Sequence, residues 1–214
     1  MMMIINPYFI SLSFSLIILW LVWTGQSISK YAIIIATVFA VVTTTYYNIT
    51  HNPGLMLWLC NFTILMGLFL CFRFRQVLFD IFFYFCWTGS LLTLFIFDNP
   101  VAPPMDSNPI SFVGFILKHS IPLILTVQFI KNDNRGLSLK SLKNSLIALI
   151  VYAVFMAIFN IIFDQNILDF RYATLDIEKA FGPWPNYVIV NIAIALIWFK
   201  SIEIISKIFG LIRT

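Results

Sequence analysis

Residues 143–164 read KNSLIALIVYAVFMAIFNIIFD, and no charged side chain falls between Lys143 and Asp164. A helix that crosses the roughly 30 Å hydrocarbon core of a bilayer needs about 20 apolar residues. Six other segments meet this requirement or come close to it. The seven segments are 9–25, 31–47, 54–72, 77–97, 110–130, 143–164 and 186–205. The sequence therefore predicts one all-α domain over residues 1–214, a polytopic membrane bundle of seven transmembrane helices, with six helices and a re-entrant segment as the alternative.

The composition excludes several classes of protein. Of the 214 residues, 61% are hydrophobic and 10% are charged, whereas soluble globular chains carry about 25% charged residues. Disordered chains and nucleic-acid-binding domains are excluded as well, because the chain is rich in aromatic residues and has no dense basic stripe. A membrane β-barrel would alternate apolar and polar residues, and these runs are continuous.

Metal and cofactor chemistry is not expected. The chain has three cysteines and two histidines, too scattered for a disulfide framework or a zinc cage. A metal site built from His51, His119 and Asp98 is not supported by any ligand-spacing motif.

The distribution of basic residues predicts the orientation in the membrane. With the N-terminus outside, nine of the 13 Lys and Arg fall in inner loops or the C-terminal tail. Only Arg171 and Lys179 fall in outer loops, and this split follows the positive-inside rule. We therefore expect the N-terminus outside and the C-terminus inside a cell membrane, and the Ile- and Phe-rich composition indicates a bacterial plasma membrane. Asp80 is expected to pair with Arg73 or Arg75 at the inner face.

Four polar residues are predicted to lie in the outer half of the membrane, where ionisable side chains are costly and therefore candidates for function. At about 1.5 Å per residue, Cys60 lies about 9 Å, His119 roughly 13 Å and Asn160 about 6 Å below the outer edge. Asp98 ends the segment 77–97 on the same side. The thiol, imidazole, amide and carboxylate thus share one layer.

A cysteine and a histidine at matching depth suggest a nucleophile and its base. His119 would accept the thiol proton and return it to a leaving oxygen, while Asn160 or Asp98 orients the imidazole or stabilises an oxyanion. Lipid ester bonds lie just below the headgroups, so the pattern favours acyl transfer. The alternatives are that Cys60 is a small buried apolar residue and that His119 and Asn160 hydrogen-bond between packed helices.

Three further residues are candidates for contact with a lipid headgroup. Lys118, at about 12 Å depth, extends to the interface, pairs with Asp98 or holds a lipid phosphate. Trp184 belongs with Trp58 to an outer aromatic belt, and Asn186 opens the last segment on the same side.

Four short motifs occur in a characteristic order: Leu57-Trp58-Leu59-Cys60, His119, Asn160 and Gly182-Pro183-Trp184-Pro185. This pattern resembles the YwaF-like bacterial integral membrane proteins, which are related to the transmembrane protein 164 acyltransferases. The resemblance implies a membrane enzyme in which Cys60 accepts the acyl chain, His119 is its partner, and phospholipids are acyl donor and acceptor. The chain departs from the family pattern at Met56-Leu57-Trp58, where a proline and a polar residue are usual.

Two other classes of protein remain open at this point. A transporter, channel or receptor that binds a lipid or small ligand would use Lys118, Asp98 and His119 as a relay. It would need a polar path into the inner half of the membrane, where Gln128 is one of few embedded polar groups. A non-catalytic subunit of another membrane protein is the third class.

Overall fold

The computed structural model describes residues 7–51, 53–95, 102–173 and 176–213, and in these ranges helices joined by short connections form the fold. The α-helices are α1 (Pro7–Trp23), α2 (Lys30–His51), α3 (Leu59–Phe72), α4 (Gln76–Phe85), α5 (Leu91–Phe95), α6 (Pro109–Lys131), α7 (Ser141–Ile162), α8 (Asp176–Ala180) and α9 (Asn186–Ile208). Two 3-10 turns, η1 (Pro53–Leu57) and η3 (Ile167–Asp169), and a π-helical turn, η2 (Cys86–Ser90), complete them. The all-α class is confirmed.

Five stretches are long and apolar enough to cross a bilayer: α2, the run Gln76–Phe95, α6, α7 and α9. Leu12–Trp23 in α1 and all of α3 are shorter apolar helices. The chain is therefore a multi-pass membrane protein, while the count of seven spans and the orientation of the termini stay predictions.

The expected segment 54–72 is not one continuous helix. Pro53–Leu57 forms the 3-10 turn η1, Trp58 is extended, and α3 begins only at Leu59. Asn61 stabilises this break, because its Nδ2 donates a hydrogen bond to the carbonyl oxygen of Leu55 at 2.7 Å. Cys60 consequently lies in the first turn of α3 instead of deep in a long span.

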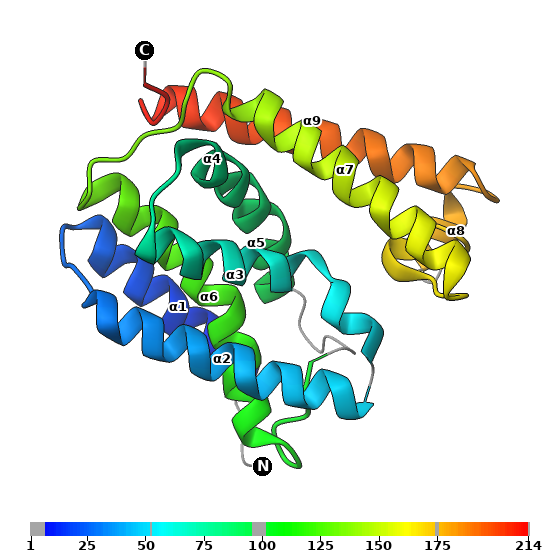
Figure 1. The fold of residues 1–214 in the computed structure, drawn as a ribbon, viewed down its shortest axis with the longest axis horizontal. Coiled ribbons are helices and arrows are strands. Elements are labelled where there is room, and N and C mark those ends of the chain that lie inside the picture. The colour runs from blue at the N-terminus through cyan, green and yellow to red at the C-terminus, as the bar shows by residue number, and fades with distance from the viewer. Residues whose placement is uncertain (1–6, 52, 96–101, 174–175, 214) are drawn as a thin grey trace, which may run out of the picture.

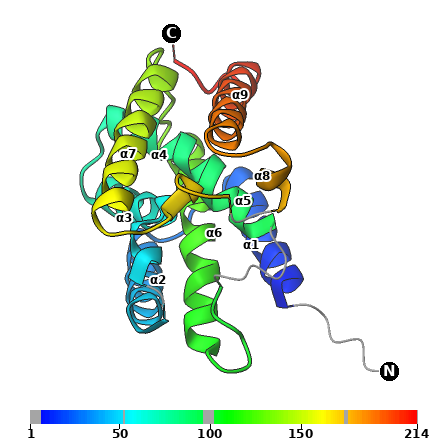
Figure 2. The same ribbon diagram turned by 90° about the vertical axis from the view of Figure 1, so that its right-hand side faces the viewer.

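Helix α6 lies at the centre of the bundle. Helices α1, α2, α3 and α5 pack around it, and 83% of its spanning stretch is buried (Figure 1). In α7 and α9 only 17% and 11% are buried. These two helices lie on one side of α4 and α5, with α1, α2 and α6 on the other (Figure 2). A helix that is apolar all round belongs inside a protein or in lipid, so α6 is the interior helix and α7 and α9 face lipid.

Two glycines let the helices around α6 approach closely. A Cβ at Gly114 would lie 1.9 Å from Oγ1 of Thr43 on α2, and a Cβ at Gly67 on α3 would lie 3.1 Å from Cδ1 of Leu125 on α6. Small residues at such crossings are the usual means of close helix packing in membranes. The contacts fix α2 and α3 against α6 and so position the side chains at the end of the bundle that carries Cys60.

A buried carboxylate organises the opposite end of the bundle. Asp80 is completely buried, and its oxygens accept hydrogen bonds from Gln76 Nε2 (3.0 Å), Ser138 N (3.0 Å), Ser138 Oγ (2.6 Å) and Asn144 Nδ2 (3.0 Å). We call Gln76, Asp80, Ser138 and Asn144 the Asp80 cluster. It ties α4 to the start of α7 and to the loop before it.

The expected ion pair of Asp80 with Arg73 or Arg75 was wrong. Both arginines precede α4 and are exposed, whereas Asp80 faces α7, where Ser145 Oγ also donates to its backbone carbonyl at 3.1 Å. The carboxylate is therefore satisfied by neutral donors in the helix interface.

Candidate active site

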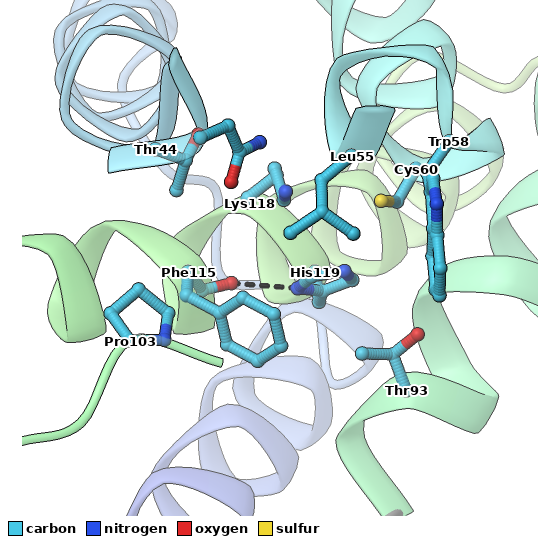
Figure 3. Close-up of a pocket in the computed structure, with 10 residues that line it drawn as sticks. Thr44, Leu55, Trp58, Cys60, Thr93, Pro103, Phe115, Lys118 and His119 are labelled. Atoms are coloured by element: carbon cyan, nitrogen blue, oxygen red, sulfur yellow. Dashed lines mark hydrogen bonds between the residues drawn. The ribbon is translucent and has the colours of Figure 1, made fainter. Parts of the chain in front are cut away.

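A small cavity lies where the end of α2, the start of α3, α5 and the middle of α6 meet (Figure 3). The lining residues are Thr44, Asn48, Leu55, Trp58, Cys60, Thr93, Pro103, Phe115, Lys118 and His119. We call this space the Cys60 cavity. Its volume is about 20 Å³, which accommodates one water-sized group. The predicted nucleophile and base therefore lie at the same cavity.

His119 is held in one orientation by its own helix. Its side chain is 1% exposed, and Nδ1 lies 2.7 Å from the carbonyl oxygen of Phe115. A carbonyl oxygen only accepts hydrogen bonds, so Nδ1 carries the hydrogen, and Nε2 of the neutral ring is left as an acceptor. The ring also packs on Phe115, with centroids 4.4 Å apart. The imidazole thus has the tautomer that a general base at Nε2 requires.

Cys60 is the second residue of α3, and its sulfur points into the cavity (Figure 3). Among the described residues no hydrogen bond joins Cys60 to His119. Instead, both side chains face the one space that a reacting group would occupy. Cys71 and Cys86 are buried elsewhere in the bundle.

Lys118 places a cation beside this pair. Its side chain is 4% exposed, Nζ donates to Asn61 Oδ1 at 3.3 Å, and it lies 5.6 Å from the centre of the Phe115 ring. No carboxylate in the described part of the chain forms an ion pair with it. Asp98, the predicted partner of Lys118 and supporting residue of the site, lies outside the described residues.

Asn160 is not among the residues that line the Cys60 cavity. Its Nδ2 donates to the carbonyl oxygen of Ile167 at 2.8 Å, and its Oδ1 accepts from the Ile167 amide at 2.9 Å. The side chain thus closes the loop that follows α7. Because both ends of the amide are engaged there, the geometry gives it no part in orienting His119.

Trp184 and Asn186, the predicted headgroup contacts, also lie away from the cavity lining. Trp184 is 64% exposed, and its Nε1 donates to the carbonyl oxygen of Phe170 at 3.2 Å. Asn186 is the first residue of α9. Trp184 thus belongs to the connection between α7 and α9, and Asn186 begins the helix that follows it.

Sequence reasoning missed Asn61, which touches both the turn η1 and Lys118. Its Nδ2 donates to the carbonyl oxygens of Leu55 and Met56, and its Oδ1 accepts from Lys118. A strongly polar residue directly after Cys60 in an apolar segment was the available signal. Trp58, interpreted as part of an aromatic belt, also lines the cavity beside Cys60.

A family model described as the TMEM164 family matches residues 1–202. The chain belongs to the TMEM164 family. The match covers every residue that lines the Cys60 cavity, and it confirms at family level the resemblance drawn from the four motifs. No curated protein and no solved structure matches the chain.

Proposed function

We propose that this TMEM164-family membrane protein is an acyltransferase that moves a fatty acyl chain between lipids, with Cys60 as nucleophile and His119 as general base. One observation carries the proposal: Cys60 on α3 and His119 on α6 line the same buried cavity together with Lys118. A nucleophile, a base and a cation around a space that admits one carbonyl group are the parts that acyl transfer needs.

The first half-reaction forms a thioester on Cys60. The thiol gives its proton to His119 Nε2, and the sulfur attacks the carbonyl carbon of a phospholipid acyl ester. As the C–S bond forms, the C–O bond to the glycerol backbone breaks. The proton on Nε2 moves to the departing alkoxide, which leaves as a lysophospholipid.

The second half-reaction returns the enzyme to its starting state. The hydroxyl of an acceptor lysophospholipid gives its proton to Nε2, and its oxygen attacks the thioester carbonyl. The C–S bond breaks, and the thiolate takes the proton back from His119. Water in place of the lipid acceptor would release a free fatty acid by the same steps.

Lys118 supplies the positive charge in this scheme. Each half-reaction passes through a tetrahedral intermediate with a negatively charged oxygen, and a preoriented cation in a site without bulk water stabilises that charge strongly. Lys118 is buried at the cavity. This position suits a charge that develops inside the cavity better than a headgroup at the membrane surface.

The embedded polar groups at the other end of the bundle favour an enzyme over a transporter. Gln128 donates through Nε2 to the carbonyl oxygen of Ile28 at 3.0 Å and accepts from the Ile28 amide at 3.4 Å. The Asp80 carboxylate is satisfied by four donors. These groups hold the backbone and the helix interface together instead of lining a polar path.

The test is intact-mass spectrometry of the purified protein after incubation with phospholipid. We expect an acyl adduct that hydroxylamine removes and that maps to Cys60. The adduct should be absent in Cys60→Ala and present in the matched controls Cys71→Ala and Cys86→Ala, whose cysteines are also buried. Lipid turnover without any adduct on Cys60, or equal turnover in Cys60→Ala, would overturn the proposal.

A further inference from the structure

An apolar groove runs along the outer side of α3, between α4 and α7. Its lining residues are Leu59, Phe62, Leu65, Met66, Phe69, Leu78, Ile81, Phe85, Ala148 and Tyr152. The groove has a volume of about 510 Å³, far more than the Cys60 cavity. Among its lining side chains Tyr152 alone carries a polar atom, and that hydroxyl donates to the carbonyl oxygen of Leu57 at 2.8 Å. The groove therefore suits a long apolar ligand.

The length of the groove matches one leaflet of a bilayer. Its lining follows α3 from Leu59 to Phe69, which at about 1.5 Å per residue is roughly 15 Å. Half of the roughly 30 Å hydrocarbon core is the same length. A fatty acyl chain that starts beside Leu59 would end near Phe69.

One end of the groove adjoins the Cys60 cavity. Leu59 lines the groove, and its neighbour in the chain, Cys60, lines the cavity. On the facing turn η2, Gly89 carries no side chain, and a Cβ there would meet Leu59 at 3.7 Å. The first turn of α3 thus separates a polar space that holds a thiol, an imidazole and an ammonium from an apolar space of acyl-chain length.

We infer that this groove binds the fatty acyl chain whose carbonyl carbon reacts at Cys60, and that its length sets the preference for chain length. The inference rests on the proposed function, because it takes Cys60 as the acyl acceptor. The polarity of the two spaces matches that of an acyl ester. The ester group would meet the polar residues of the Cys60 cavity, and the acyl tail would lie along α3 on the apolar side chains of the groove.

Shortening the groove should change the preferred chain. Ala148 lies one helical turn from Tyr152 in the direction of the Asp80 end, so Ala148→Phe places a ring across the middle of the groove. With oleoyl and octanoyl phospholipids, the ratio of oleoyl to octanoyl adduct on Cys60 should fall about tenfold, the order expected for inserting bulk into an occupied space. Val151→Phe, on the exposed face of the same helix, should leave the ratio unchanged. Equal ratios in both variants would contradict the inference.

A second measurement needs neither turnover nor a substitution in the groove. Phospholipids with a photoreactive diazirine near the carboxyl end, in the middle or at the tip of one acyl chain are cross-linked to Cys60→Ala. We expect the cross-links to move with probe position, from Leu59 and Tyr152 through Met66 to Phe69 and Leu78. Cross-links spread evenly over the exposed faces of α7 and α9 would show ordinary lipid contact and overturn the inference.

The two experiments separate this inference from the proposed function. Ordered cross-links without any thioester on Cys60 would support the groove and remove the chemistry. A thioester on Cys60 with scattered cross-links and unchanged chain selectivity would support the chemistry and remove the groove.

Discussion

The two ends of the bundle each contain a buried polar group, and they differ in how fully its hydrogen bonds are made. The Asp80 carboxylate accepts four hydrogen bonds from neutral donors. At the Cys60 cavity, by contrast, the described residues give His119 a side-chain hydrogen bond through Nδ1 only and Lys118 one through Nζ to Asn61. The hydrogen bonds around Asp80 leave little capacity to bind a ligand. At the Cys60 cavity, the described contacts leave the His119 imidazole able to accept, and the Lys118 ammonium group able to donate, a hydrogen bond to a group in the cavity.

This difference distinguishes buried polar groups that stabilise the fold from buried polar groups that are available for chemistry. Burying a polar group costs free energy unless the group is hydrogen-bonded. Because the protein's own groups supply the hydrogen bonds of the Asp80 carboxylate, the Asp80 cluster stabilises the packing of the helices. Buried polar groups around a cavity that do not make all their possible hydrogen bonds lower the stability of the fold, and such groups are typical of functional sites. Substitutions at the two ends of the bundle test this distinction.

Replacing the nucleophile should remove activity without unfolding the protein. Cys60→Ala loses the group that forms the covalent bond, so lipid acyl transfer should fall by roughly three orders of magnitude or more. The thermal midpoint in detergent should stay close to that of the wild type, because a small side chain replaces another. A variant that loses activity only as far as it loses folded protein would make Cys60 structural.

Removing the Asp80 carboxylate should have the opposite effect: it should lower the stability of the fold and leave the activity of the folded protein unchanged. Asp80→Leu removes the acceptor of the half-buried Ser138 and Asn144 and one of the two hydrogen bonds of Gln76, which should lower the free energy of unfolding by about 3 kcal/mol. Asp80→Asn keeps part of the hydrogen bonding and should cost about 1 kcal/mol. Chemical denaturation in mixed micelles measures both, with acyl transfer per folded molecule unchanged. A selective loss of turnover would break the distinction between the two ends.

Neutralising the cation in the cavity should slow the chemical step. Lys118→Met keeps much of the side-chain volume but loses the charge that stabilises the oxyanion, so kcat should fall about tenfold to a hundredfold. Lys143→Met, at an exposed position early in α7, is the matched control. An increase in KM for lipid at constant kcat would instead assign Lys118 to headgroup binding.

The smallest effect is expected at an exposed ion pair outside both clusters. The hydrogen bond from Lys179 lowers the pKa of Asp176 below its ordinary value. Any stabilisation from the pair is therefore present at neutral pH and lost as the pH falls through the pKa of the folded state. Because the pair is exposed, Lys179→Ala should change neither thermal midpoint nor turnover measurably. A clear loss of stability would show that α8 carries more of the fold than its exposure suggests.

Apolar run length predicted the helices well, because the need to satisfy backbone groups in lipid leaves few other conformations. Each of the seven expected segments contains helix, and five stretches of the described chain are long and apolar enough to cross a membrane. The hydropathy pattern did not predict the break before α3. The break depends on a specific hydrogen bond, from Asn61 to the Leu55 carbonyl oxygen, that stabilises η1 as a separate turn. Depth calculated from helix entry at residue 54 therefore misjudged where Cys60 lies along α3.

Depth also predicted the site only in part. Cys60, His119 and Lys118 share a cavity, whereas Asn160, expected in the same layer, closes the loop after α7. Whether two side chains meet depends on their depth in the membrane and also on the direction in which each side chain points from its helix. For Asp80, proximity in sequence to Arg73 and Arg75 suggested ion pairs, but the direction of α4 turned the carboxylate toward Asn144.

Asn61 connects the turn η1 in the cavity wall to the ammonium group of Lys118. One amide group contacts Leu55 and Met56 on one side and Lys118 on the other. Any replacement of Asn61 therefore disturbs the turn beside the nucleophile and the anchoring of the ammonium group together. If the proposed acyl transfer holds, a kinetic defect of an Asn61 variant will therefore combine the effects of both contacts.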